Sequence, residues 1–98
     1  MEINYYISAR GEALVQGINV SLSAEFQKNN IPATVSFSSS GNFDVNGEPV
    51  FMNINGGYNV EKRIFNNLNS SFLPSGFVAE LETKVIEFFN QIKIDQAL

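Results

Sequence analysis

The chain has 98 residues, of which 44% are apolar and 16% are charged, and its net charge is −4 at neutral pH. This length suits a single core, since domains commonly hold about 100–150 residues, and we expect one domain over residues 1–98. The six basic residues do not cluster beyond Lys62-Arg63, which argues against nucleic-acid binding, because that binding rests on Lys and Arg neutralising phosphates.

The chain contains no Cys, His or Trp. Without Cys and His it lacks thiolate and imidazole metal ligands, a Cys nucleophile and the commonest acid–base group. We therefore expect no metal site, no cofactor and no catalytic activity. The N-terminal residues have neither the basic nor the apolar region of a signal peptide, and no apolar run approaches the ~18 residues of a spanning helix. These features predict a cytoplasmic protein that does not enter a membrane.

The first third of the chain alternates apolar and polar residues, the period of a half-buried strand. This pattern predicts strands over residues 2–9, 13–22 and 31–38. Gly11-Glu12 is interpreted as the tight connection between the first two strands. The small polar residues 38–41 are interpreted as a loop after the third.

Asn46-Gly47 is the strongest turn signal in the sequence. An Asn-Gly pair favours a two-residue type I′ hairpin, which needs positive φ at both central residues. We predict that it joins strands over residues 42–45 and 49–54, with Phe43 opposite Val50.

Asn55-Gly56-Gly57 allows two interpretations. It could be another hairpin turn, after which the sheet continues. Alternatively, a short helix could follow it, with Asn59 as its N-cap and four apolar residues on one face: Val60, Ile64, Phe65 and Leu68. We favour a helix over residues 60–69, while residues 58–68 remain ambiguous between strand and helix.

The last helix, predicted over residues 76–93, has the clearest pattern. Pro74-Ser75 precedes it, and seven apolar residues fill an arc of about 120° on a helical wheel: Phe77, Val78, Leu81, Val85, Phe88, Phe89 and Ile92. Ile86 and Ile94 lie outside this stripe.

Strands followed by helix predict an α+β layer fold. We expect an antiparallel β-meander of four to five strands packed by the long C-terminal helix, with a short helix before it. No βαβ crossover restricts the strand order.

Few residues suggest chemistry. Two carboxylate pairs, Asp44 with Glu48 and Glu80 with Glu87, could act as acid and base if they were buried together. A polar hairpin tip and a solvated helix face explain them more simply. Gly56-Gly57 could direct backbone N–H groups at an anion, but a turn accounts for both glycines.

The leading hypothesis is a small non-catalytic interaction protein: a homo-oligomer, an accessory subunit or an inhibitor of a larger protein. Its expected partner is a protein or a second copy of this chain. Tyr6, Ile86 and Ile94 are the candidate interface residues, because neither the sheet nor the helix stripe requires all of them in a core.

A second hypothesis is a domain that binds a small apolar ligand in a cavity between sheet and helix. The residues that would line this cavity are Tyr5, Phe51, Tyr58, Phe77 and Phe88, although a filled core is the commoner arrangement. An enzyme that uses carboxylates alone is the third hypothesis.

Overall fold

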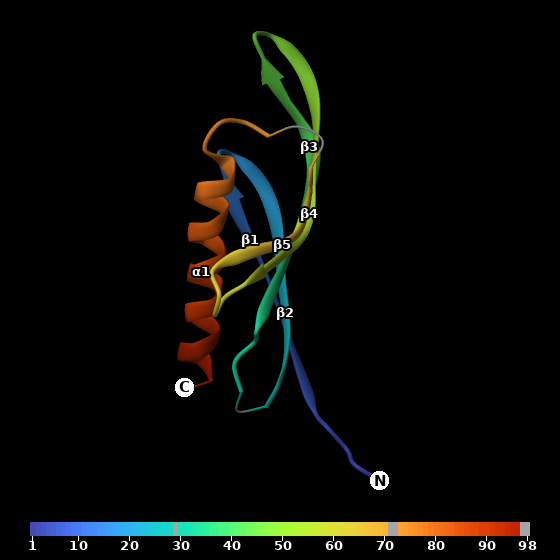
Figure 1. Ribbon diagram of the computed structural model, residues 1–98. Helices are drawn as coiled ribbons and strands as arrows, with labels where there is room; N and C mark the ends of the chain where they lie inside the picture. The colour runs from blue at the N-terminus through green and yellow to red at the C-terminus, as the bar shows by residue number, and fades with distance from the viewer. Residues whose placement is uncertain (29, 71–72, 97–98) are drawn as a thin grey trace.

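The computed structural model describes residues 1–28, 30–70 and 73–96. It contains one five-stranded antiparallel sheet in the order β1-β2-β3-β4-β5, followed by one helix (Figure 1). The elements are β1 (Tyr6–Val15), β2 (Ile18–Gln27), β3 (Thr34–Val45), β4 (Glu48–Asn59), β5 (Ile64–Ser70) and α1 (Phe77–Asp95). The predicted α+β meander with a long C-terminal helix is confirmed.

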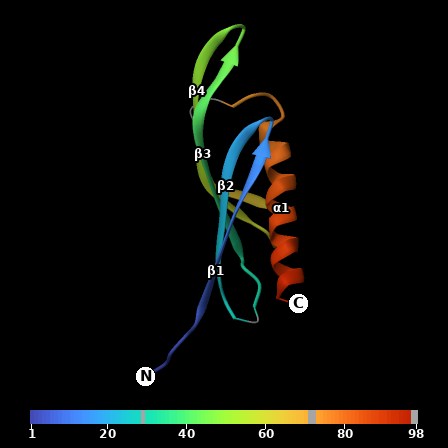
Figure 2. The same cartoon turned by 180° about the vertical axis from the view of Figure 1, so that it is seen from behind.

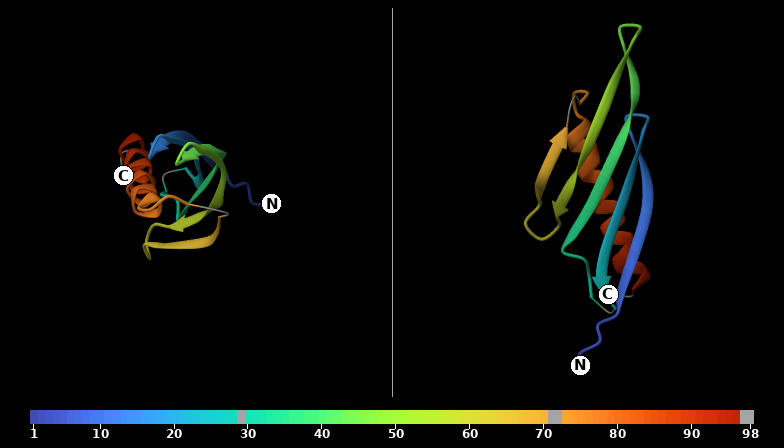
Figure 3. Two further views of the ribbon diagram at one scale, coloured as in Figure 1. Left: turned by 90° about the horizontal axis from the view of Figure 1, so that it is seen from above. Right: turned by 90° about the vertical axis from the view of Figure 1, so that its right-hand side faces the viewer.

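The sheet and the helix form two layers. Helix α1 covers one face of the sheet, and the other face is bare (Figures 1 and 2). Seen end-on, the sheet is curved and the helix lies on its concave side (Figure 3, left). The β3–β4 hairpin projects beyond the other strands (Figure 3, right), which contributes to the long dimension of 56 Å.

The core lies between the concave face of the sheet and α1. Alternate residues of the central strands point into it, as the period of two requires. The helix contributes Phe77, Leu81, Val85, Phe89 and Ile92. The sheet contributes Val15, Val20, Leu22, Ala24, Phe26, Val35, Phe37, Met52, Ile54 and Tyr58.

Two hairpins have the same two-residue turn. Gln16-Gly17 and Asn46-Gly47 both have positive φ at each residue, the geometry that matches the twist of paired strands. The predicted Asn46-Gly47 hairpin is confirmed, and Phe43 pairs with Val50.

The prediction of a turn at Gly11-Glu12 is wrong. Both residues lie within β1, where they pair with Leu22 and Ser21. The first strand therefore runs to Val15, beyond the predicted end at residue 9, and the second begins at Ile18 instead of residue 13. Positive φ at Gln16 lets the turn form with a single glycine, at Gly17, which we had placed inside a strand.

The predicted loop at residues 38–41 is also wrong. Strand β3 is continuous through it and joins the predicted strands 31–38 and 42–45 into one. Ser38 and Ser40 are exposed, whereas Ser39 and Gly41 are half-buried. The alternation of a strand persists, and small polar residues suit it because its outer side faces solvent.

The predicted helix over residues 60–69 is a turn followed by β5. Strand β4 extends to Asn59, beyond the predicted end at residue 54, so Asn55-Gly56-Gly57 lies inside a strand. The Asn59 side-chain Oδ1 accepts a hydrogen bond of 2.9 Å from the Lys62 backbone N–H, which stabilises the turn. Pairing with β4 then outweighs a short helical pattern of apolar residues.

The predicted last helix is confirmed as α1, with bounds that differ by one or two residues from the predicted 76–93. No helix in the described part of the chain combines the length and the apolar character needed to cross a membrane.

Tyr58 links the sheet to the helix. Among the fully buried side chains of the described residues, it is the one that carries a hydroxyl. Its hydroxyl donates a hydrogen bond of 2.8 Å to Glu82 Oε2 on α1. Its ring packs edge-on against Phe65, with centroids 4.9 Å apart. Burial raises the pKa of the Tyr58 hydroxyl above its ordinary 10.0, the hydrogen bond and charge of Glu82 add to this, and Arg63 opposes it.

We expect Tyr58→Phe to lower the free energy of unfolding by about 1 kcal/mol near neutral pH, the value of one hydrogen bond. Wild-type stability should also fall faster than that of the variant at alkaline pH. The folded state holds this proton more tightly than the unfolded chain, so the contribution is complete below about pH 10 and disappears as the pH rises through the raised pKa. Urea unfolding between neutral and alkaline pH measures both effects.

Tyr6→Phe is the matched control, because Tyr6 is 59% exposed and the same hydroxyl is removed. It should leave both quantities unchanged. Parallel pH profiles for wild type and Tyr58→Phe would contradict the prediction.

Candidate binding sites

The candidate interface residues lie on two elements. Tyr6 is at the start of the edge strand β1 and is exposed. Ile94 is 69% exposed near the end of α1. Ile86 is half-buried on the same helix, where it lines a cavity described below.

The five residues proposed for a ligand cavity do not surround a common space. Tyr58 and Phe77 are fully buried in the core, and Phe88 is half-buried. Tyr5 and Phe51 are 73% and 58% exposed. These five residues therefore do not form the cavity of the second hypothesis, and two of them are part of the core between sheet and helix.

The carboxylates of the two candidate pairs have different surroundings. Asp44 and Glu48 are exposed next to the β3–β4 turn. Glu80 Oε2 accepts a hydrogen bond of 3.0 Å from the backbone N–H of Gln16, which joins the β1–β2 turn to α1. Glu87 lies 3.8 Å from Lys84 Nζ. Among the described residues, no three Asp or Glu side chains come together as a metal site would require.

Strand β1 is a candidate binding element because it forms one edge of the sheet (Figure 3, right). It pairs with β2 at all ten residues without a register shift. Burial decreases from β2 to β1: Val20 and Leu22 are buried, whereas Ile7, Ala9 and Ala13 on the same face of β1 are only half-buried. The apolar surface of the sheet therefore continues to an uncovered margin.

Arg10 and Glu12 flank Gly11 on the exposed face of β1. Glu12 Oε2 accepts a hydrogen bond of 3.3 Å from Asn19. Within the described part of the chain, neither side chain forms a salt bridge. On the other face, a Cβ at Gly11 would lie 3.0 Å from the ring of Phe88, so a glycine lets the helix approach this strand.

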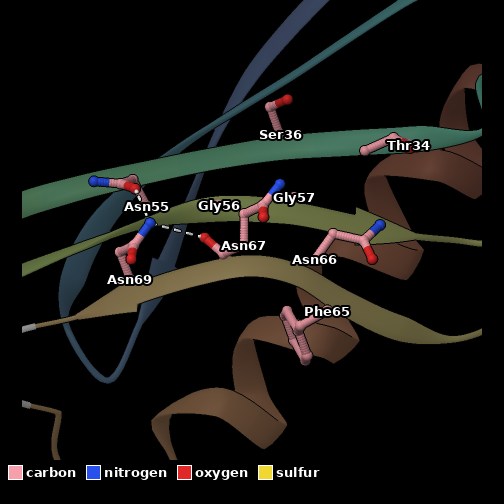
Figure 4. Close-up of a pocket in the computed structure, with 9 residues that line it drawn as sticks. All are labelled: Thr34, Ser36, Asn55, Gly56, Gly57, Phe65, Asn66, Asn67 and Asn69. Atoms are coloured by element: carbon pink, nitrogen blue, oxygen red, sulfur yellow. Dashed lines mark hydrogen bonds between the residues drawn. The ribbon is translucent and has the colours of Figure 1, made fainter.

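The bare face of the sheet carries an asparagine-lined trough across β3, β4 and β5 (Figure 4). Its volume is about 630 Å³, and its side chains are uncharged. The Asn69 side-chain amide donates to the Asn67 carbonyl at 3.0 Å and contacts Asn55 Oδ1 at 3.5 Å. A register shift between Asn55 and Gly57, with Asn67 at positive φ, marks a β-bulge in β5.

A second cavity lies where the C-terminal half of α1 meets two connections of the sheet. It has a volume of about 590 Å³ and is lined by parts of the β2–β3 connection, the β4–β5 turn and the helix. Pro32, Val60, Ile86 and Phe89 give it an apolar surface, and the charged residues at its border are Arg63, Lys93 and Glu61. It combines an apolar lining with charge, whereas the lining of the trough is uncharged.

From the sequence we did not predict a role for Arg10 with Glu12, the trough or the second cavity. Opposite charges two residues apart in a strand were a usable signal, but we had interpreted Gly11-Glu12 as a turn. The two cavities join segments far apart in the sequence, and no local pattern indicates that juxtaposition.

Comparison with known proteins gives no match: no family model, no curated protein and no solved structure resembles this chain at a significant level. A function must therefore be inferred from its own residues.

The bulge that shapes the trough gives a testable prediction about Gly56. A Cβ there would lie 3.0 Å from the Asn67 carbonyl oxygen and 3.1 Å from the Leu68 Cα, both backbone atoms that cannot rotate away. We expect Gly56→Ala to lower the free energy of unfolding by about 2 kcal/mol, the usual cost of overpacking. Chemical denaturation would measure the change.

Gly41→Ala on the neighbouring strand β3 is the control, because a Cβ at Gly41 has no atom within 4 Å. Equal stabilities of the two variants would show that β4 and β5 do not approach each other as closely as described.

Proposed function

We propose that this chain is a small non-catalytic interaction protein whose binding element is the edge strand β1, and that its partner is a second copy of the chain. The observation that carries the proposal is the ten-residue, bulge-free pairing of β1 on one side only. Backbone groups that point away from β2 have no strand partner among the described residues, and such an edge is a template for another strand.

The opposite edge of the sheet is protected. Strand β5 has seven residues and contains the bulge at Asn67. Short edges and bulges are two of the features by which proteins prevent unwanted strand pairing. β1 has neither feature, and it contains no proline. Pairing is therefore favoured at β1.

The sequence of β1 is complementary to itself in one antiparallel register. With a two-fold axis at Gly11, Arg10 lies opposite Glu12 of the second copy, and Glu12 lies opposite its Arg10. Opposite charges directly across an antiparallel pair are stabilising. On the other face, Ala9 meets Ala13 and Ile7 meets Val15, so apolar residues oppose apolar residues.

Net charge also favours β1 as the contact. The chain carries −4, so two copies repel when their acidic surfaces approach. Strand β1 carries one Arg and one Glu and is neutral. Pairing two copies through it brings no excess of like charge together. Tyr6, one of the candidate interface residues, lies directly before the paired residues 7–15, whereas Ile86 and Ile94 on α1 are not part of the paired strands.

A charge exchange on β1 tests the proposal. We expect sedimentation equilibrium to find a dimer and both Arg10→Glu and Glu12→Arg to weaken it about tenfold or more. Each substitution turns two attractive cross-strand pairs, worth about 0.2–1 kcal/mol each, into repulsive ones. The double variant Arg10→Glu/Glu12→Arg should restore the wild-type dimer, because the exchanged charges again oppose each other.

Glu25→Arg is the matched control, since Glu25 is an exposed carboxylate on the neighbouring strand β2 and lies outside the predicted contact. It should leave the dimer unchanged. Hydrogen exchange gives a second measurement: amides of β1 that point away from β2 should gain protection as the dimer forms. A wild-type monomer at all concentrations, or single variants that the double variant does not rescue, would overturn the proposal.

A further inference from the structure

The cavity of about 590 Å³ beside the C-terminal half of α1 has the size of a small-molecule site. It is formed by three segments far apart in the sequence: residues 31–33, residues 60–63 and helix residues 86–93. A backbone hydrogen bond of 3.1 Å from Val60 N–H to the Ala33 carbonyl joins the first two segments. This bond holds two of the three lining segments next to each other.

The inner surface of the cavity is apolar. Phe89 is 8% exposed and Pro32 is buried, so both are held in place by the core. Val60 and Ile86 are half-buried and pack against the same core. An apolar group in this cavity would remove both its own surface and theirs from water, which is favourable.

The border of the cavity carries two cations. Arg63 and Lys93 form no salt bridge with any carboxylate of the described residues. Lys93 Nζ lies 5.8 Å from the centroid of the Phe89 ring, so its charge is directly above the apolar surface. Arg63 follows the turn fixed by Asn59, with its backbone N–H 2.8 Å from the Asn59 carbonyl.

The charged residues around the cavity indicate the sign of the charge on its ligand. The cavity is lined by Arg63, Lys93 and one carboxylate, Glu61, and is therefore net positive on a chain of net charge −4. An arginine guanidinium binds a carboxylate through two parallel hydrogen bonds. An inorganic anion would leave the apolar surface hydrated, whereas a neutral apolar molecule would leave both cations without an anionic partner.

We propose that this cavity binds a small carboxylate with an apolar tail: the tail contacts Ile86 and Phe89, and the carboxylate lies between Arg63 and Lys93. None of these residues belongs to β1. The proposal is therefore independent of self-association through that strand, and either one can fail while the other holds.

Octanoate is a suitable probe, and 1-octanol and octylamine are matched controls that share its tail but not its charge. We expect calorimetry on the full chain to find octanoate bound at least tenfold more tightly than either control. In NMR titrations, the amide shifts should be concentrated in residues 31–33, 60–63 and 86–93. Equal affinity for octanol, or shifts concentrated elsewhere, would overturn the proposal.

Variants separate the two parts of the site. Arg63→Asn/Lys93→Gln removes both cations, and Asn tolerates the positive φ of 57° at position 63. We expect it to lose the preference for octanoate and to bind octanol as wild type does.

Ala33→Trp, at an exposed position of the lining, should block both ligands by filling the cavity. Unfolding curves and circular dichroism would establish that both variants are folded.

Lys84→Gln is the control for charge alone, because Lys84 lies on the same helix but outside the cavity lining. It should bind octanoate as wild type does. Loss of binding in Lys84→Gln equal to that in the double variant would show that long-range charge, and not this cavity, selects the carboxylate.

Discussion

The burial of the concave face of the sheet under a single helix determines the rest of this structure. Five apolar side chains of α1, from Phe77 to Ile92, pack onto alternate residues of the strands. Each fully buried Val, Leu, Ile or Phe contributes about 1.5–3 kcal/mol, so this layer is the main source of stability. One helix cannot cover five curved strands completely. The margins of the sheet, where β1 and the ends of the strands lie, are therefore the places where apolar surface remains for other contacts.

The two edges of the sheet differ for a local reason. In β5, the bulge at Asn67 requires the close approach of its backbone to Gly56, and the same shift opens the trough on the bare face. In β1, Gly11 has the opposite effect: it lets Phe88 approach while the strand stays regular. One glycine accommodates an irregular edge, and another lets the helix pack against a regular edge. A regular edge can accept a further strand along its whole length, whereas a bulge interrupts such pairing.

The sequence predicts the fold where local geometry and tertiary structure require the same residues. Asn46-Gly47 supplies the two positive φ angles of its hairpin, and the period of the last segment defines α1. The sequence is misleading where small residues are compatible with both a loop and a strand. Ser38–Gly41 resembles a loop yet lies in β3, because the outer face of an open sheet is solvated. Gly11 resembles a turn residue yet lies in β1, where the absence of a Cβ lets Phe88 of α1 pack close to the strand. Arg63 and Lys93 could not be recognised as neighbours at one cavity before the turns were known.

Ile86 illustrates why the fold can favour an apolar residue outside the helix stripe. Helix α1 has 19 residues and is therefore about 28 Å long at 1.5 Å per residue. Its C-terminal half reaches the end of the sheet, where the β2–β3 connection and the β4–β5 turn replace strands. Connections cannot present the regular alternating surface on which a helix packs closely, so a cavity remains there, and the side chain that faces it is apolar but only half-buried. The same geometry places Lys93 two turns further along the helix on the border of that cavity. A carboxylate ligand with an apolar tail would thus occupy the gap that the topology leaves, and its tail would complete the contacts of Ile86.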